Sequence, residues 1–224
     1  MTETVKIPIF PLGVVLLPDM LLPLHIFEER YKQMIFECRT EDKPFGIVLF
    51  DGQSIRPVGC TAQITEVVKR YDDGRMDILT RGGERFVIRE LIQDQAYMEA
   101  RVFFFDDGPE DASEGQLKDI VESALNLLKE APGIHLGFDP PSPGGRIHPK
   151  TLSYAIASLE GFTPAERQDF LEMTSSTERL KKCVQALSRI VARNRLTLEI
   201  RKMIGGNGHP PRTILREFDG LEKK

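Results

Sequence analysis

Prolines interrupt the longest apolar stretch of this chain. Residues 5 to 24 are almost wholly apolar, yet they contain four prolines and one acidic residue: Pro8, Pro11, Pro18, Pro23 and Asp19. A membrane-spanning helix needs about 20 apolar residues with an intact ladder of backbone hydrogen bonds. Each proline removes a donor from that ladder and disfavours helical geometry in the preceding residue. We therefore expect short extended pieces joined by bends, buried in a soluble β domain.

Composition sets broad limits on the class of protein. A chain of 224 residues suits one large or two small domains. Hydrophobic residues make up 41% and charged residues 29%, which is enough for a core and for a hydrated surface. The net charge of −4 provides no general attraction to nucleic acid or acidic lipid. The three cysteines form no disulfide framework or metal motif, and no signal peptide is recognisable, so a cytoplasmic location is expected.

Strand signals dominate the first half of the chain. Residues 45 to 50 form a short apolar run, and residues 60 to 65 alternate between apolar and polar side chains. Both patterns are typical of strands. Gly74 predicts a hairpin turn, and Gly82-Gly83 predicts a second one, because glycine tolerates the backbone angles of tight turns. Cys60 falls in an alternating strand, where a small buried residue is expected.

One helix is predicted within this β-rich half. Its apolar residues recur at helical spacing on a single face that we expect to be buried: Phe27, Tyr31, Met34, Ile35 and Cys38. His25 lies just before this helix. A single histidine beside an apolar segment is more often a hydrogen-bonding residue than a ligand, so we assign His25 that role.

Beyond residue 113 the apolar period becomes helical. Glycine and proline are frequent between residues 132 and 149, which indicates a loop inside the helical half. Thr163-Pro164-Ala165-Glu166 has the pattern of a capping box with proline at the first helical position. Ser175 to Glu178 offers a second start, for a long helix that runs to Ile204. We predict a β-rich domain over residues 1–112, a helical domain over 113–205 and a flexible tail over 206–224.

A series of short motifs is spread along both halves of the chain. They are Ile7 to Leu12, Pro23 to Glu28, Arg30-Tyr31, Phe45 to Leu49, Val58 to Ile64, Asp73 to Arg75, Arg85-Phe86, Ala155 to Ala157, Glu166 to Gln168, Leu171-Glu172 and Arg179-Leu180. In this order they resemble the N-terminal substrate-binding domain of Lon proteases over roughly residues 5 to 200. The resemblance implies an α+β fold with a PUA-like, mainly antiparallel β pseudo-barrel. A C-terminal helical bundle ending in a long helix is expected to follow.

The motifs of the other Lon modules are missing from this sequence. A Lon protease carries an ATPase module and a Ser-Lys protease domain after the region of resemblance. The sequence contains no G-x-x-x-x-G-K-[ST] phosphate-binding loop, and about twenty residues follow the last predicted helix. We therefore expect a stand-alone substrate-binding domain without ATPase or protease activity. Such a domain would hold or deliver unfolded or degradation-prone polypeptides, and a separate ATPase or protease is a further candidate partner.

Independent signals for catalysis are weak. The four histidines, His25, His135, His148 and His209, lack the spacing of a metal site, and no G-x-S-x-G motif is present. We expect no catalytic residue, no metal and no cofactor. The alternative is an RNA- or ribonucleoprotein-associated protein, because PUA-like folds elsewhere bind RNA. Nucleic acid is the less favoured partner, and a membrane partner is not expected.

Two groups of side chains are candidate partner-binding residues. Phe103 and Phe105 point to one side of the last expected strand, residues 97 to 105, while Phe104 points to the other. Packing in the core or between domains is favoured over an exposed patch. The second group comprises Lys181, Lys182, Arg189 and Arg193, from a segment with eight basic and two acidic residues between positions 178 and 202. A hydrated helix face is favoured there over docking of an acidic partner or RNA.

Overall fold

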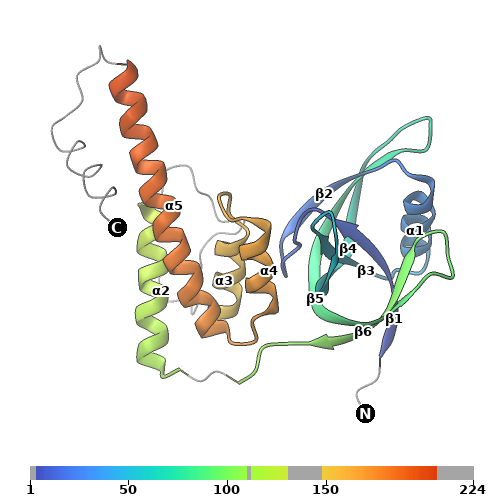
Figure 1. Ribbon diagram of the computed structural model, residues 1–224, viewed down its shortest axis with the longest axis horizontal. Coiled ribbons are helices and arrows are strands. Elements are labelled where there is room, and N and C mark those ends of the chain that lie inside the picture. The colour runs from blue at the N-terminus through green and yellow to red at the C-terminus, as the bar shows by residue number, and fades with distance from the viewer. Residues whose placement is uncertain (1–3, 110–111, 131–147, 206–224) are drawn as a thin grey trace.

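The computed structural model describes residues 4–109, 112–130 and 148–205 (Figure 1). A β-rich part comes first and a helical part second, as the order of motifs predicted. The elements are β1 (Val5–Leu12), β2 (Leu21–Ile26), α1 (Glu29–Thr40), β3 (Phe45–Phe50), β4 (Ile55–Arg70), β5 (Met76–Ile92), β6 (Met98–Phe105), α2 (Glu114–Lys129), α3 (Pro149–Ala157), α4 (Pro164–Glu172) and α5 (Ser176–Gly205). We call β1–β6 with α1 the β part, and α2–α5 the helical part.

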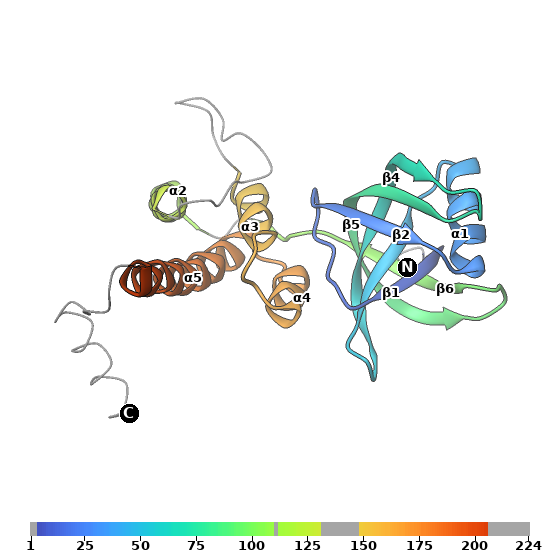
Figure 2. The same cartoon turned by 90° about the horizontal axis from the view of Figure 1, so that it is seen from above.

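The six strands form one sheet that closes on itself. Their order is β2-β5-β4-β3-β1-β6, and the second half of β5 pairs with β6. β2 pairs with the first half of β5, so it extends the sheet beyond the closed barrel. β1 and β3 run parallel, and the other described pairs are antiparallel. The expected α+β class with a mainly antiparallel barrel is therefore confirmed. α1 and the helical part lie on opposite sides of this barrel (Figures 1 and 2).

The apolar N-terminal segment folds as two strands and a buried bend. β1 contains Pro8 and Pro11, and β2 contains Pro23. Between the strands, Val15, Leu16 and Leu17 are buried in the main hydrophobic core. The expectation of extended pieces joined by bends is confirmed. None of the helices that the structure describes is long and apolar enough to cross a membrane.

The predicted turn at Gly82-Gly83 is wrong, because β5 continues through both residues as one strand. These glycines permit close packing. A Cβ atom on Gly82 would lie 2.0 Å from the carbonyl oxygen of Leu17, and one on Gly83 would lie 2.6 Å from Oγ1 of Thr61. The segment before β2 therefore rests directly on the backbone of β5. Gly74, by contrast, has φ +81° in the hairpin between β4 and β5, as predicted.

The helix α1 begins later than its apolar pattern predicted. Tyr31, Met34, Ile35 and Cys38 are buried on one face, as expected. Phe27, however, precedes the N-terminal cap residue of the helix and is 59% exposed. Its inclusion in the buried face was wrong, because the backbone is still extended at Glu28.

Two capping boxes start helices in the helical part. Thr163 caps α4 together with Glu166, as predicted, and Ser113 caps α2 together with Gln116. Oγ of Ser175 accepts a hydrogen bond from the backbone N–H of Glu178 at the start of α5. α2 and α3 pack against α5, which extends past both (Figure 1). Most of the predicted Gly/Pro-rich loop and the tail over 206–224 lie outside the described residues. The division into domains at residue 112 stays a prediction.

Candidate functional site

An apolar stripe lies on the outer face of β2. Alternate side chains of a strand point to opposite faces. Leu22, Leu24 and Ile26 pack into or against the main core, so the residues between them face outward. We call this outward set the β2 stripe, and its members are Leu21, Pro23, His25 and Phe27. Leu21 is 48% exposed and Phe27 is 59% exposed, so this stripe offers apolar surface to a partner.

The neighbouring strand widens the β2 stripe. Across the sheet, Leu21 stands opposite Arg81, and Pro23 stands opposite Leu79. Leu79 is half-buried and adds apolar surface beside Pro23, whereas Arg81 is exposed at the border. Pro23 also lacks a backbone donor, which suits an outer strand and discourages pairing with another strand. A partner would therefore contact this surface mainly through side chains.

His25 is held in place by a small polar network. Its Nδ1 lies 2.6 Å from Oδ1 of Asp77, and the hydroxyl of Tyr71 donates a hydrogen bond of 2.9 Å to Oδ2 of the same carboxylate. The hydrogen bond with His25, followed by that from Tyr71, lowers the pKa of Asp77. The expectation that His25 is a hydrogen-bonding residue is confirmed. Its ring stacks on Phe27, with the centroids 5.9 Å apart, and so fixes the exposed end of the β2 stripe.

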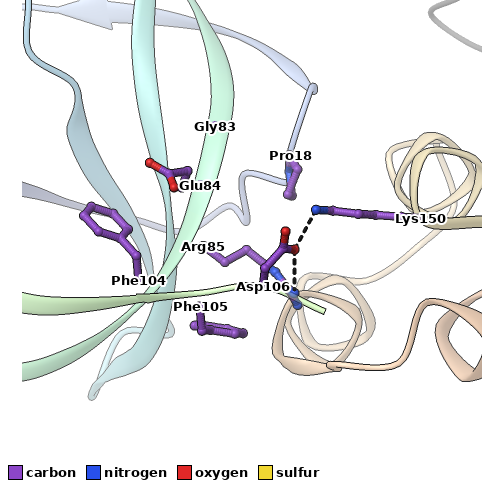
Figure 3. A pocket seen from close by; sticks show the side chains of 8 residues that line it. All are labelled: Pro18, Gly83, Glu84, Arg85, Phe104, Phe105, Asp106 and Lys150. Atoms are coloured by element: carbon purple, nitrogen blue, oxygen red, sulfur yellow. Dashed lines mark hydrogen bonds and ion pairs between the residues drawn. The ribbon is translucent and has the colours of Figure 1, made fainter. Parts of the chain in front are cut away.

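A cleft opens where the β part meets the helical part. Its volume is about 300 Å³, and Figure 3 shows the residues that line it: Pro18, Gly83, Glu84, Arg85, Phe104, Phe105, Asp106 and Lys150. We call it the interlobe cleft. The side chains of Arg85 and Lys150 both point toward Asp106 (Figure 3). Nζ of Lys150 lies 2.6 Å from Oδ1 of Asp106, and this hydrogen bond lowers the pKa of Asp106.

A buried charge cluster joins the two parts beside this cleft. Asp107 lies between Arg85 of β5 and Arg179 of α5, and its two oxygens lie 2.5 Å from the nearest nitrogen of each. The exposed fractions of these side chains are 8%, 1% and 0%, respectively. Arg85 and Arg179 also donate to the carbonyl oxygen of Met173 in the helical part. The cluster therefore fixes the helical part against the barrel.

The charge of Asp107 makes this junction sensitive to acid. Burial raises the pKa of Asp107, but the hydrogen bonds and charges of Arg179 and Arg85 outweigh burial and hold the pKa below its usual value. A depressed pKa in the folded state stabilises the fold above the unfolded value of about 3.9. That stabilisation is lost as the pH falls through the folded pKa.

We therefore expect the stability gap between the wild type and Asp107→Asn to shrink on acidification. At neutral pH the wild type gains from the charged carboxylate, and this advantage declines as the pH falls below about 3.9, because the unfolded chain then binds a proton at this position more readily than the folded protein does. Urea unfolding midpoints measured from neutral pH downward would follow the gap. A gap that stays constant down to about pH 2 would contradict this account of the cluster.

Of the two predicted phenylalanines, Phe105 lines the interlobe cleft, and both Phe103 and Phe105 are half-buried. The guanidinium of Arg85 covers the ring of Phe105 at 4.5 Å from its centroid, and that of Arg89 lies 6.0 Å from Phe103. Phe104 points the other way and packs against a second core cluster that contains Phe86. The alternation predicted for these residues is therefore confirmed. A partner-binding role for Phe103 and Phe105 stays a prediction.

The predicted basic residues lie apart from these phenylalanines, along α5. Lys181 pairs with Glu178 at 2.6 Å, and Arg189 pairs with Glu166 at 3.3 Å. Lys182 and Arg193 are exposed on the same helix. Paired, exposed cations are typical of a hydrated helix face, and a partner-binding role for these four residues stays a prediction.

The β2 stripe was missed from the sequence, although a signal for it was present. Leu21, Pro23 and His25 alternate with three core residues, which is the period of a strand. The helical spacing places Phe27 on the buried face of the following helix, so the sequence predicts a core residue at this position of the row. With that helix moved two residues later, the same pattern predicts an exposed apolar row.

Neither a metal-binding cluster nor an exposed cysteine is found in the part of the chain that the structure describes. No group of three or more His, Cys, Asp or Glu residues there could hold a metal ion. Cys38, Cys60 and Cys183 are all buried, and burial raises the pKa of each thiol to about 12. A thiol in that state is a poor nucleophile near neutral pH.

Comparison with known proteins places this chain in a family. Residues 6–189 match the family described as the ATP-dependent protease La (LON) substrate-binding domain. The Lon protease of Paraburkholderia phytofirmans is 25% identical over 211 residues, which cover 87% of this chain and 25% of the relative. Lon protease 2 of Syntrophobacter fumaroxidans is 30% identical over 190 residues, covering 79% of this chain and 23% of the relative.

Solved structures share the fold. A Lon N-terminal domain protein from Xanthomonas campestris superposes with a TM-score of 0.63 at 20% identity, over 81% of this chain and 98% of that one. The N-terminal domain of a Mycobacterium avium complex Lon protease gives 0.58 at 17% identity, over 82% and 98%. This chain spans about a quarter or less of the length of the curated relatives it matches. The matched region is their substrate-binding domain, and their ATPase and protease domains lie outside the match.

Proposed function

Because this chain belongs to the family of LON substrate-binding domains, we propose that it binds polypeptide segments through the β2 stripe. The observation that carries this proposal is the row of outward side chains Leu21, Pro23, His25 and Phe27, with Leu79 beside it. An unfolded client exposes apolar side chains that a folded one buries. Contact with such a row removes apolar surface from water on both partners, at roughly 25 cal/mol per Å².

The proposed role is that of a non-enzymatic adaptor or holdase. An apolar row without a deep, shaped pocket favours apolar segments broadly and reads little sequence, because hydrophobic contact is not directional. The buried, poorly reactive cysteines support a role without nucleophilic chemistry. The RNA-associated alternative receives less support, because α5 contains no aromatic residue on which a base would stack.

Replacing Phe27 by serine tests the surface directly. We expect the affinity for reduced, carboxymethylated α-lactalbumin, which stays unfolded, to fall about tenfold or more. The reason is that a buried phenylalanine contributes about 1.5 to 3 kcal/mol and about 1.4 kcal/mol is a factor of ten. Fluorescence anisotropy of the labelled client would give the Kd of each variant.

Phe36→Ser is the matched control. Phe36 is the more exposed phenylalanine, at 69%, and lies two turns along α1, away from β2. Its replacement should leave the affinity unchanged. Equal losses in both variants, or a loss only in Phe36→Ser, would refute the assignment of binding to the β2 stripe. If the wild type binds RNA and no unfolded polypeptide, the proposed function itself is wrong.

A further inference from the structure

The β2 stripe and the interlobe cleft are two ends of one surface. The outward positions of β5 run from Asp77 through Leu79 and Arg81 to Gly83, and Gly83 lines the cleft. On the neighbouring chain segment, Leu21 ends the stripe and Pro18, three residues earlier, lines the cleft. The two segments stay joined between these points, because Asp19 N–H donates to Gly82 O and Gly82 N–H donates to Met20 O, both at 2.9 Å. A bound chain could follow this ribbon without leaving the surface.

We propose that a client segment lies along the β2 stripe in extended form and inserts its end residues into the interlobe cleft. The proposal rests on the proposed function and adds the path, the length and the second anchor of the client. From Leu21 to Phe27 an extended chain covers about 20 Å, at about 3.3 Å per residue. With the cleft included, the surface would hold a segment of about eight to ten residues.

The walls of the interlobe cleft define the chemistry of its occupant. At about 300 Å³, it is at the small end of the range for ligand pockets, so it holds one or two residues and not a large cofactor. Pro18 and Phe105 provide apolar surface, while Glu84 and the Lys150–Asp106 pair provide charges of both signs. This combination fits a residue with an apolar stem and a polar or charged end.

The helical part closes the far end of this path. Lys150 stands in the first turn of α3 and reaches across to Asp106 at the end of β6. Behind them, the side chain of Arg85 is buried, and one of its nitrogens donates to the carbonyl oxygen of Leu171. The helical part therefore forms the end wall of the client site. Its junction with the barrel contributes to client binding as well as to stability.

Thiol labelling can follow both ends of the path in one protein. The native cysteines are buried, so a new exposed cysteine would be the site that reacts with a maleimide. Glu84→Cys reports on the cleft, Leu21→Cys reports on the stripe, and Gln53→Cys, at the exposed hairpin between β3 and β4, is the control. Each rate is measured with and without reduced, carboxymethylated α-lactalbumin at about ten times its Kd. Only unoccupied protein reacts, so occupancy slows labelling about tenfold.

The proposal predicts slower labelling of both the Glu84→Cys and the Leu21→Cys thiols, with the Gln53→Cys thiol unaffected. Protection of Leu21→Cys without protection of Glu84→Cys would overturn this inference and leave the proposed function intact. Protection of neither thiol, or of Glu84→Cys alone, would overturn both. Slowing at Gln53→Cys as well would mean that the client coats the protein without a path, which also contradicts the inference.

Loss of the Lys150–Asp106 pair provides a second readout. Lys150→Ala is expected to weaken the binding of a client peptide of about ten residues several-fold, while leaving unchanged the affinity for a peptide of about seven residues that spans the stripe alone. The control is Arg56→Ala, which removes another ion pair between the two parts, that of Arg56 with Glu172 at 2.8 Å. Equal effects of both variants would assign the loss to the junction in general and count against a specific role of the cleft.

Discussion

Replacing Asp107 by alanine is expected to lower the free energy of unfolding by about 3 to 5 kcal/mol, which is the usual cost of breaking a buried ion pair. Arg85 and Arg179 would lose the carboxylate they share while remaining almost fully buried. The desolvation of two guanidinium groups would then be poorly compensated. Urea unfolding at neutral pH would measure the loss as a lower transition midpoint.

The adjacent residue provides the control for this prediction. Asp106 has the same side chain, but it is 67% exposed; it pairs with Lys150 at 2.6 Å and lies farther, at 3.7 Å, from Arg85. Asp106→Ala is therefore expected to cost at most about 1 kcal/mol. If the two alanine variants unfold at the same urea concentration, the buried cluster is not the main polar contact between the two parts.

The second large effect is expected at Gly82. A Cβ atom there would lie 2.0 Å from the backbone oxygen of Leu17, and backbone cannot move aside as the end of a flexible side chain can. Gly82→Ala should therefore destabilise the protein by about 3 kcal/mol or more, at or beyond the usual range for overpacking. The substitution should also displace the segment before β2, and with it Pro18, which lines the interlobe cleft. Thermal unfolding measures the first effect, and binding of a client peptide of about ten residues measures the second.

The same substitution should have the opposite sign at Gly115. That residue lies in the first turn of α2, and a Cβ atom added to it would meet open space, with nothing within 4 Å. Alanine is favoured over glycine in a helix by about 0.5 to 1 kcal/mol. A small gain in stability from Gly115→Ala, together with a large loss from Gly82→Ala, would show that the loss at Gly82 comes from the steric contact with Leu17 and not from replacing a glycine as such. Similar effects at both positions would refute the packing role of Gly82.

Local patterns predicted the elements whose signals lie within a few residues. The capping box at Thr163, the hairpin at Gly74 and the buried face of α1 depend on short-range spacing, and the structure confirms them. The turn predicted at Gly82 is wrong for a physical reason. Glycine serves turns and close approach of backbones equally well, and only tertiary contacts distinguish these uses.

Features that depend on contacts between residues far apart in the sequence could not be predicted in this way. Arg85 and Arg179 are 94 positions apart in the sequence. Charged residues are usually expected at the surface, and only the fold shows that these two are buried with Asp107 between them. The interlobe cleft combines the segment before β2, two strands and α3, so no single stretch of sequence indicates it. The β2 stripe was recognisable in part. Its outward orientation became definite only when the pairing of β2 with β5 fixed the register.

Chemical-shift mapping can show residue by residue whether the β2 stripe binds clients. Isotope-labelled protein would be titrated with a short apolar peptide, and the backbone amide signals would be followed residue by residue. If the β2 stripe binds the peptide, the perturbed signals gather at residues 21–27 and at Leu79 and Arg81 on the paired strand. Perturbations confined to Lys182, Arg189 and Arg193 on α5, or no perturbation at a peptide concentration that saturates binding, would contradict it.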